Sequence, residues 1–481
     1  MDTSFFGHPR GLSTLFFTEM WERFSYYGMR AILILFMTAS ASNGGLGLGT
    51  ADAGAIYGLT TALVYMAALP GGWIADQFLG LRKSVLYGGV LIAGGNFCLV
   101  IPHMAAFYSG LAMIVAGTGL LKPNVSAIVG QLYLPEDNRR DAGFSIFYMG
   151  INTGAFIAPL LCGWVAQYNW RYGFGLAGSG MTLGVIQYVW GSRKLGDAGL
   201  KAAGVNDRVK SRKRLILGLS ILTAIIGIVV ALGILGMATA KGIADASGLV
   251  LVLVVVIFFS WLLSSKQWTI VERRRLMVVL GLFVAAAIFW SVFEQAGSTL
   301  NLFAERSTNN RVAGHSFPAP WYQSVNALFL IFLAPVFAWV WIRLGSKEPS
   351  SPAKFALGLL LVGLGFVVLA IGASAAASGA KVSPMWLIVT YLFHTMGELC
   401  LSPVGLSAMT KLAPASVTGL MMGVWFLALS VGNYMGGRMA SLYESLALET
   451  LFGAVGAFAV FAGLILALCV KPMVRLMGGM R

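Results

Sequence analysis

The stretch RKLGDAGLKAAGVNDRVKSRKR, residues 193–214, is the longest charged segment of the chain and carries eight basic residues. Apolar runs long enough to cross a bilayer, which takes about 20 residues of helix, lie on both sides of it. Six runs precede it. Two plain apolar runs, a basic linker at 266–275 and six more runs follow it. The chain is therefore predicted to hold two sets of six membrane helices separated by a central pair.

The composition excludes most soluble classes of protein. Of the 481 residues, 58% are apolar and 11% are charged, and the mean hydropathy is +0.81. Soluble proteins are roughly a quarter charged, so a soluble enzyme is not expected. The net charge is +15, but no domain combines clustered basic residues with interspersed aromatic residues, so no nucleic-acid partner is expected either. No G-x-S-x-G, H-E-x-x-H, phosphate-binding loop or CxxC is present, and the four cysteines lack metal or disulfide spacing.

Lysine and arginine are distributed unequally between the two sides of the predicted spans. The connections on the side of the N-terminus carry 24 of the 33 basic residues and the opposite connections carry 6. Because basic connections stay in the cytoplasm, both termini are expected there. The acidic start leads into an apolar run too long for a signal peptide, so the first span is expected to be retained. The predicted spans are residues 12–39, 51–76, 81–102, 105–131, 141–167, 170–192, 214–238, 246–265, 276–304, 319–343, 354–377, 383–412, 415–440 and 447–471.

Seven ionisable side chains stand out at the depth of the bilayer, where each costs a few kcal/mol unless it faces a cavity or a partner. Four of them share the first span with two tyrosines, at offsets that form one polar stripe on a helix. Ion pairs that only tie helices together are one explanation. Charges in both halves of the chain favour a cavity for a zwitterionic solute. The residues are Glu19, Glu22, Arg23, Tyr26, Tyr27 and Arg30 in the stripe, and Lys122, Glu294 and Glu398 elsewhere.

Two sets of six helices resemble the plan of the major facilitator superfamily, in which substrate binds at mid-membrane between the halves. The segment GGWIADQFLGLRK, residues 71–83, is similar to that superfamily's loop signature G-x-x-x-D-x-x-G-x-[RK]-[RK]. Asp76 and the basic pair after it are either a charge-paired latch or a capped turn. The resemblance implies an all-α polytopic membrane fold. Its two six-helix bundles would be residues 1–192 and 276–481, with two additional helices and basic linkers at 193–275.

Two further segments resemble signatures of the proton-dependent oligopeptide transporter family, also called POT or PTR. EMWERFSYYG at 19–28 is similar to E-x-x-E-R-F-x-Y-Y-G, and FYMGINTG at 147–154 is similar to F-Y-x-x-I-N-x-G. GLLKPN at 119–124 and GELCLSPVG at 397–405 also match. The resemblance covers about residues 5–475. It implies a proton-coupled symporter that imports di- and tripeptides by alternating access. The two extra helices and the short connection near 378–383 are typical of bacterial members, so the inner (cytoplasmic) membrane is expected.

The resemblance also implies roles for individual residues in peptide binding. Arg23 and Lys122 would bind the carboxylate of the peptide, since a fixed cation in a cavity of low dielectric binds it strongly. Glu398 would bind the amino group. Aromatic walls accept many side chains without demanding one shape. The remaining residues of the expected peptide site are Asn152 and Asn326 at the amino end, Tyr26, Tyr27, Tyr65, Trp290 and Trp425 along the side chains, and Ser402.

For proton coupling, the resemblance implies that Glu19 and Glu22 form a cluster with Lys122 and Arg23, and that Glu294 pairs with Arg30. A carboxylate changes partner when it is protonated, because it loses the charge that held the cation. Only His394 among the four histidines lies in a predicted span, so coupling is expected to depend on carboxylates. The proton is the coupling ion, and no cofactor or metal is expected.

Two other functions remain open from the sequence. A proton-coupled carrier of nitrate or another small non-peptide solute on the same fold would have little use for Glu398 as an amine anchor. A channel or a non-transporting membrane subunit would not need paired charges in both halves. Peptide uptake that saturates with substrate would exclude the second.

Overall fold

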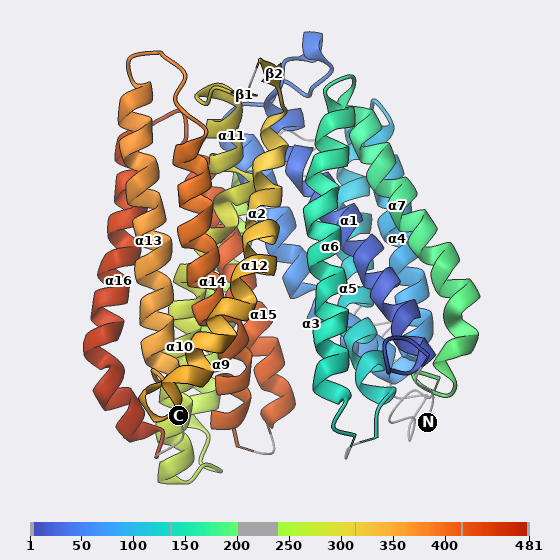
Figure 1. Ribbon diagram of the computed structural model, residues 1–481, viewed down its shortest axis with the longest axis vertical. Helices are drawn as coiled ribbons and strands as arrows, with labels where there is room; N and C mark the ends of the chain where they lie inside the picture. Colours follow the sequence, from blue (N-terminus) through green and yellow to red (C-terminus); the bar gives the residue numbers. More distant parts are fainter. Residues whose placement is uncertain (1–3, 135–136, 201–238, 313, 415–416, 479–481) are drawn as a thin grey trace. The chain divides into compact units, whose positions relative to one another are not determined.

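The protein is almost entirely helical (Figure 1). This computed structural model describes residues 4–134, 137–200, 239–312, 314–414 and 417–478. Thirteen of the predicted spans coincide with helical segments, and the span at 214–238 lies outside the described residues. Eleven of the described helices are long and apolar enough to cross a membrane. The prediction of an all-α polytopic membrane protein is therefore confirmed.

Two compact units divide the chain, and the first comprises Met1–Arg30 and Leu63–Ser247. In this unit α4 packs along α5 and α7, and α6 packs on α7. Glycines bring α4 and α5 together: a Cβ on Gly95 would lie 2.6 Å from the carbonyl oxygen of Gly110, a close approach typical of membrane helices. Its elements are α1 (Arg10–Thr38, to residue 30), α3 (Ala68–Ile74), α4 (Leu81–Val100), α5 (Met104–Gln131), α6 (Arg140–Ala166) and α7 (Trp170–Gly191).

The second unit comprises Ala31–Ala62 and Gly248–Arg481. Here α13 packs along α16 and α14, and α10 packs on α15. Strands β1 (Arg311–Val312) and β2 (His315–Ser316) form a short antiparallel hairpin between α11 and α12. The helices of this unit are α2 (Thr50–Met66, to residue 62), α9 (Ala240–Ser264, from residue 248), α10 (Ile270–Phe293), α11 (Thr299–Arg306), α12 (Tyr322–Leu344), α13 (Ser351–Ala376), α14 (Met385–Leu412), α15 (Thr418–Ala440) and α16 (Leu448–Leu476).

The boundary between the units crosses α1 and α2, because the end of α1 and the start of α2 pack on the later helices. Asn301 on α11 donates a hydrogen bond to the carbonyl oxygen of Ala31, at 2.7 Å. Gly58 on α2 lies against the backbone of Gly437 on α15. Two helices of the first half of the sequence thus continue from one compact unit into the other. The division into bundles at residues 192 and 276 stays a prediction.

Two predicted spans are broken rather than continuous. The second consists of α2, α3 and a π-helical turn at Ala75–Leu79. This turn ends at Gly80, whose positive φ of 73° suits glycine. The ninth, predicted at 276–304, consists of α10, a 3₁₀ turn at Glu294–Gly297 and α11. It also begins six residues before the predicted start at 276, because Thr269 and Glu272 form a capping box. The last part of the predicted basic linker is therefore the first turns of α10.

The loop motif at residues 71–83 bonds to backbone rather than pairing charges. Arg82 donates to the carbonyl oxygens of Ala198 at 2.6 Å and Gly196 at 2.5 Å, in the segment that follows α7. Among the described residues no ion pair joins Asp76 to the basic pair. The charge-paired latch is thus not seen, and the motif fixes the start of the central linker instead.

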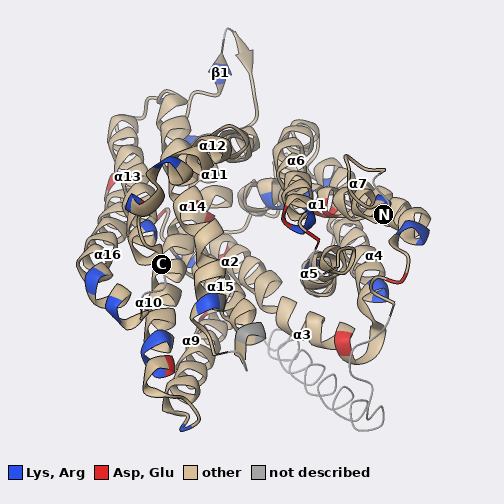
Figure 2. Cartoon of the chain, turned by 60° about the horizontal axis from the view of Figure 1, so that its bottom comes forward, with Lys and Arg blue, Asp and Glu red and all other residues tan. Residues whose placement is uncertain are grey.

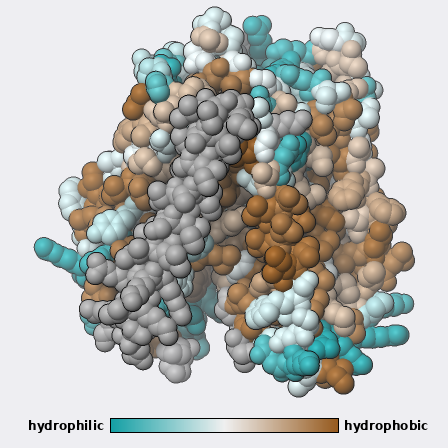
Figure 3. Space-filling model, turned by 180° about the vertical axis from the view of Figure 1, so that it is seen from behind, coloured by the Kyte–Doolittle hydropathy of each residue, from teal (hydrophilic) through white to brown (hydrophobic). Residues whose placement is uncertain are grey.

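Many of the exposed side chains on the membrane helices are large and apolar. Figure 3 shows apolar side chains over the middle of the visible face and polar side chains toward its ends. On α9, Leu249, Val256 and Ile257 are each more than half exposed. A surface of this kind suits contact with lipid, in agreement with a protein that spans a membrane.

Candidate functional site

The charged stripe on α1 forms a buried ion-pair cluster in the first unit. The Nε atom of Arg23 lies 3.3 Å from Oε1 of Glu19, four residues earlier, and it also donates to Oε2 of Glu22. Glu22 is fully buried, and Glu19 and Arg23 are each 2% exposed. Figure 2 shows both basic residues (blue) and acidic residues (red) on α1, whereas most of the ribbon is uncharged and tan. One guanidinium therefore holds two carboxylates away from water.

The two sequence signatures place this cluster through their glycines. A Cβ on Gly154, the last residue of the signature on α6, would collide with the carbonyl oxygen of Met20 and lie 3.0 Å from Cβ of Arg23. A Cβ on Gly28, the last residue of the signature on α1, would lie 2.5 Å from Sγ of Cys162 on α6. Because neither position has room for a Cβ, α1 and α6 pack closely, and this contact fixes the position of α1 and of Arg23 relative to α6.

Aromatic rings surround the cations of this cluster. The guanidinium carbon of Arg23 lies 5.2 Å from the ring centre of Tyr26 and 5.9 Å from that of Tyr27, and Arg30 lies 5.9 Å from Tyr27. Such contacts stabilise a cation within about 6 Å of the ring. The Nη2 atom of Arg23 is buried and has no hydrogen-bond partner in the described part of the chain. One end of the guanidinium fork thus remains available to a carboxylate.

Lys122 reaches the same cluster from α5, one residue before the helix-interior Pro123. Its Nζ atom lies 4.3 Å from the ring centre of Tyr65, and it interacts electrostatically with Glu19. Asn152 on α6 is 9% exposed and donates to the carbonyl oxygen of Tyr148 at 3.0 Å. The structure therefore brings Glu19, Arg23, Lys122 and Tyr65 together, and it gives the amide of Asn152 a partner in its own helix.

A second polar cluster lies in the second unit, centred on Glu398 of α14. Asn326 on α12 donates from Nδ2 to Oε2 of Glu398 at 3.2 Å and to Oγ1 of Thr395 at 3.0 Å. Asn326 and Glu398, both expected at the amino end of the peptide, are therefore joined by a hydrogen bond, and their role in binding stays a prediction. Thr395 is absent from the residues expected from sequence. Its position three residues before Glu398, on the same helical face, was the available indication.

The remaining expected residues of this unit lie around α10, α14 and α15. The ring centres of Trp290 and Trp425 are 6.4 Å apart in an edge-to-face contact. Glu294 begins the 3₁₀ turn that follows α10 and is 5% exposed. It interacts electrostatically with Glu398. The hydroxyl of Ser402, one turn after Glu398, has no hydrogen-bond partner among the described residues. Pairing of Glu294 with Arg30 would join the two units and stays a prediction.

His394 is the only histidine within a described span, as predicted from the sequence. His8 precedes α1, His103 caps the start of α5, and His315 lies in the hairpin. The ring of His394 is 1% exposed and stacks on Phe366, with ring centres 5.4 Å apart. In the described residues, no group of three or more histidine, cysteine or acidic side chains is placed to hold a metal ion. The four cysteines are free thiols.

Comparison with known proteins shows which family this chain resembles along its length. A family model described as the POT family matches residues 82–457. The chain is 43% identical over 492 residues to the peptide transporter YePEPT of Yersinia enterocolitica subsp. palearctica, covering 98% of this chain and 96% of that protein. It is 37% identical over 491 residues to the di-/tripeptide transporter of Lactococcus lactis subsp. cremoris, covering 100% and 99%.

Solved structures of transporters have the same fold as this chain. A crystal structure of a peptide transporter POT in complex with sulfate superposes with a TM-score of 0.94 at 45% identity, covering 99% of this chain and 97% of that one. The family model matches residues 82–457, and the relatives and the solved structure align with almost the whole chain. The chain belongs to the POT family of transporters.

Proposed function

We propose that this chain is a proton-coupled symporter that imports di- and tripeptides by alternating access. The observation that carries the proposal is the presence of two buried polar clusters of opposite character. One offers the unpartnered Nη2 of Arg23, and the other offers the carboxylate of Glu398 bound by Asn326. A peptide has one carboxylate and one ammonium group, so each cluster suits one end. Relatives named as peptide and di-/tripeptide transporters support this choice.

The binding roles follow from the charges. Arg23 and Lys122 hold the carboxylate of the peptide, and Glu398, oriented by Asn326 and Thr395, holds its ammonium group. Tyr26, Tyr27, Tyr65, Trp290 and Trp425 contact the side chains. The amide of Asn152 and the hydroxyl of Ser402 complete the set. Fixed charges in a site of low dielectric discriminate strongly against a ligand that lacks the matching charge.

The coupling roles follow from the shared guanidinium. A proton on Glu22 or Glu19 removes one attraction for Arg23, which then favours another anion. Proton and peptide carboxylate therefore bias the same conformational equilibrium. Glu294 and Arg30 serve the second step, and the proton is the only coupling ion, with no cofactor. The protein resides in a bacterial inner membrane with both termini in the cytoplasm.

Uptake into liposomes with an imposed inward proton gradient tests the proposal. Labelled dipeptide is expected to accumulate above equilibrium, while labelled nitrate and free amino acids are not. Collapse of both the pH gradient and the membrane potential with an ionophore should stop accumulation. Peptide accumulation that survives this collapse, or accumulation of nitrate in place of peptide, would contradict the proposal.

A further inference from the structure

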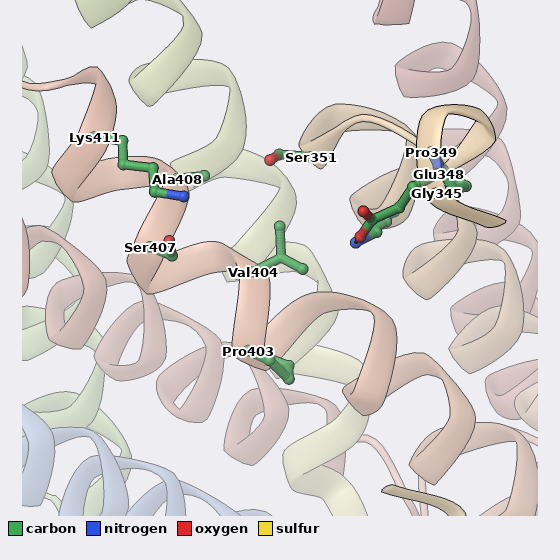
Figure 4. Close-up of a pocket in the computed structure, with 10 residues that line it drawn as sticks. Gly345, Glu348, Pro349, Ser351, Pro403, Val404, Ser407, Ala408 and Lys411 are labelled. Atoms are coloured by element: carbon green, nitrogen blue, oxygen red, sulfur yellow. Dashed lines mark hydrogen bonds and ion pairs between the residues drawn. The ribbon is translucent and has the colours of Figure 1, made fainter. Parts of the chain in front are cut away.

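A cavity of about 290 Å³ lies in the second unit, where α12 and α14 end and α13 begins (Figure 4). It is separate from the peptide and proton residues assigned above, none of which lines it. The connection between α12 and α13 forms one wall, and the last turns of α14 form the other. Its polar lining consists of Glu348, Ser351, Lys354, Ser407 and Lys411.

The start of α13 is prepared for an anion. Ser351 is the first residue of this 26-residue helix and is 8% exposed, yet its hydroxyl has no hydrogen-bond partner among the described residues. Figure 4 shows this hydroxyl directed into the cavity toward Lys411. The N-cap residue Ser350 makes no side-chain cap. The amides of Ser351 and Ala353 and the positive end of the helix dipole accompany the hydroxyl, while Pro352 between them has no N–H.

Two lysines supply positive charge from opposite walls. Lys354 is 6% exposed, forms an ion pair of 2.5 Å with Glu348, and lies 4.6 Å from the ring centre of Trp341. Lys411 is exposed on α14 and, in the described part of the chain, has no ion pair. The side chain of Glu348 is 42% exposed. The buried Lys354 is thus paired with the carboxylate of Glu348, which lies at the open side of the cavity. An anion of higher charge that enters the cavity can take the place of this carboxylate.

We infer that this cavity binds an anionic phosphate group. Lys411, the hydroxyl of Ser351 and the first turn of α13 contact its oxygens, and Lys354 is the inner cation that it shares with Glu348. Phosphate presents several acceptor oxygens, which matches donors that converge from two walls. The inference is independent of the peptide site and does not require the proposed transport function.

The phosphate group has two possible sources, a lipid headgroup or a soluble phosphate compound. Exposed apolar residues on α12 lead to the rim at Gly345: Val336, Trp339 and Ile342 are 49%, 58% and 81% exposed at helical spacing. Such a strip suits an acyl chain beside the cavity. Basic pockets between membrane helices are a known mode of binding anionic lipid headgroups.

Direct binding to the purified, delipidated full-length protein in neutral detergent distinguishes these sources. The probes are dihexanoylphosphatidylglycerol, dihexanoylphosphatidylcholine, glycerol 3-phosphate and inorganic phosphate. Phosphatidylglycerol binding at least tenfold tighter than the two soluble phosphates identifies a lipid site, and equal affinities identify a soluble one. Either result supports the inference, provided that phosphatidylcholine binds more weakly than phosphatidylglycerol. No measurable binding of any anionic probe overturns it.

Variants locate the binding. Lys411→Gln and Ser351→Val are each expected to weaken binding on the order of tenfold, the cost of one charge-assisted or buried hydrogen bond. Glu348→Gln is expected to strengthen binding several-fold, because it frees Lys354, and a merely structural residue would not do this. Lys471→Gln, an exposed lysine on α16 outside the cavity, is the matched control and should change nothing.

The peptide cluster is itself cationic, so Lys122→Gln serves as a second control and should leave the affinity unchanged. Loss of binding in Lys122→Gln would show that the probe occupies the peptide cluster and would overturn the inference. Unaltered binding in both Lys411→Gln and Glu348→Gln would also overturn it. These two residues are exposed, so their variants are expected to fold even where Ser351→Val does not.

Discussion

At the residue scale, the cluster around Arg23 is defined by competition for one guanidinium. Two buried carboxylates, Glu19 and Glu22, share its Nε, while its Nη2 has no partner among the described residues. Protonation of a carboxylate or arrival of a peptide carboxylate changes which groups Arg23 holds. Binding and coupling therefore depend on the same side chain but on different partners, so they can be separated by substitution.

Glu22→Gln is expected to abolish proton-driven accumulation and to leave peptide exchange between preloaded vesicles measurable. Glutamine keeps an acceptor for Arg23 and removes the proton-binding group, and exchange requires reorientation of the site but no net proton movement. Counterflow of labelled dipeptide checks this, on purified variant protein that has first been shown to be folded and monodisperse. Loss of both activities together in a folded protein would assign Glu22 to binding or structure.

The orientation of the peptide is tested by blocking its ends. Lys122→Ala should remove the advantage of a free-acid dipeptide over its C-terminal amide, and Glu398→Ala should remove the advantage of a free amine over an N-acetylated peptide. Loss of one partner of a buried charge pair costs several kcal/mol, so affinity losses on the order of a hundredfold are expected. Competition with the four end-blocked peptides measures both. Strong discrimination against N-acetylation by Glu398→Ala would reverse the assignment.

At the element scale, the contact between α1 and α6 determines where the charged stripe lies. Gly154→Ala is expected to destabilise the protein by about 1–3 kcal/mol, the usual cost of overpacking, because the new methyl group meets the carbonyl oxygen of Met20. The melting temperature should fall, and peptide affinity should fall with it because Arg23 moves.

Gly175→Ala on α7 is the matched control for that substitution. A Cβ there has only Val100 nearby, at 3.7 Å, so the variant should be as stable as the parent or slightly more so through reduced chain entropy in the unfolded state. Equal stability of Gly154→Ala and Gly175→Ala in thermal unfolding would show that α1 moves freely relative to α6.

At the scale of the whole molecule, the distribution of basic residues predicts the orientation in the membrane. In a cysteine-free background, His315→Cys in the hairpin between α11 and α12 is expected to react with an impermeant maleimide added outside intact cells. Ser346→Cys, at the next connection, should react only after the membrane is opened. Both positions are exposed, so accessibility through the bilayer decides the result. The opposite pattern would place both termini outside.

Local sequence was sufficient for the position and composition of the described spans and for most residues of both clusters, although it missed Thr395. Hydropathy and the helical repeat are properties of neighbouring residues, so thirteen spans and the stripe on α1 could be read directly. The match at 397–405 indicated Glu398 and the family resemblance implied Asn326, and the structure joins the two by a hydrogen bond. Which residues fulfil the binding and coupling roles stays a prediction.

Contacts between segments far apart in the sequence were decided only by the tertiary structure. The break of α10 at Glu294, the hydrogen bond of Thr395 with Asn326, and the bonding of Arg82 to the carbonyls after α7 each depend on the group that lies across a helix interface. The same holds for Arg23, which had Glu19, Glu22 and other anions as possible partners. Helical spacing determines which side chains share a face, but the packing of other helices on that face determines which of them meet.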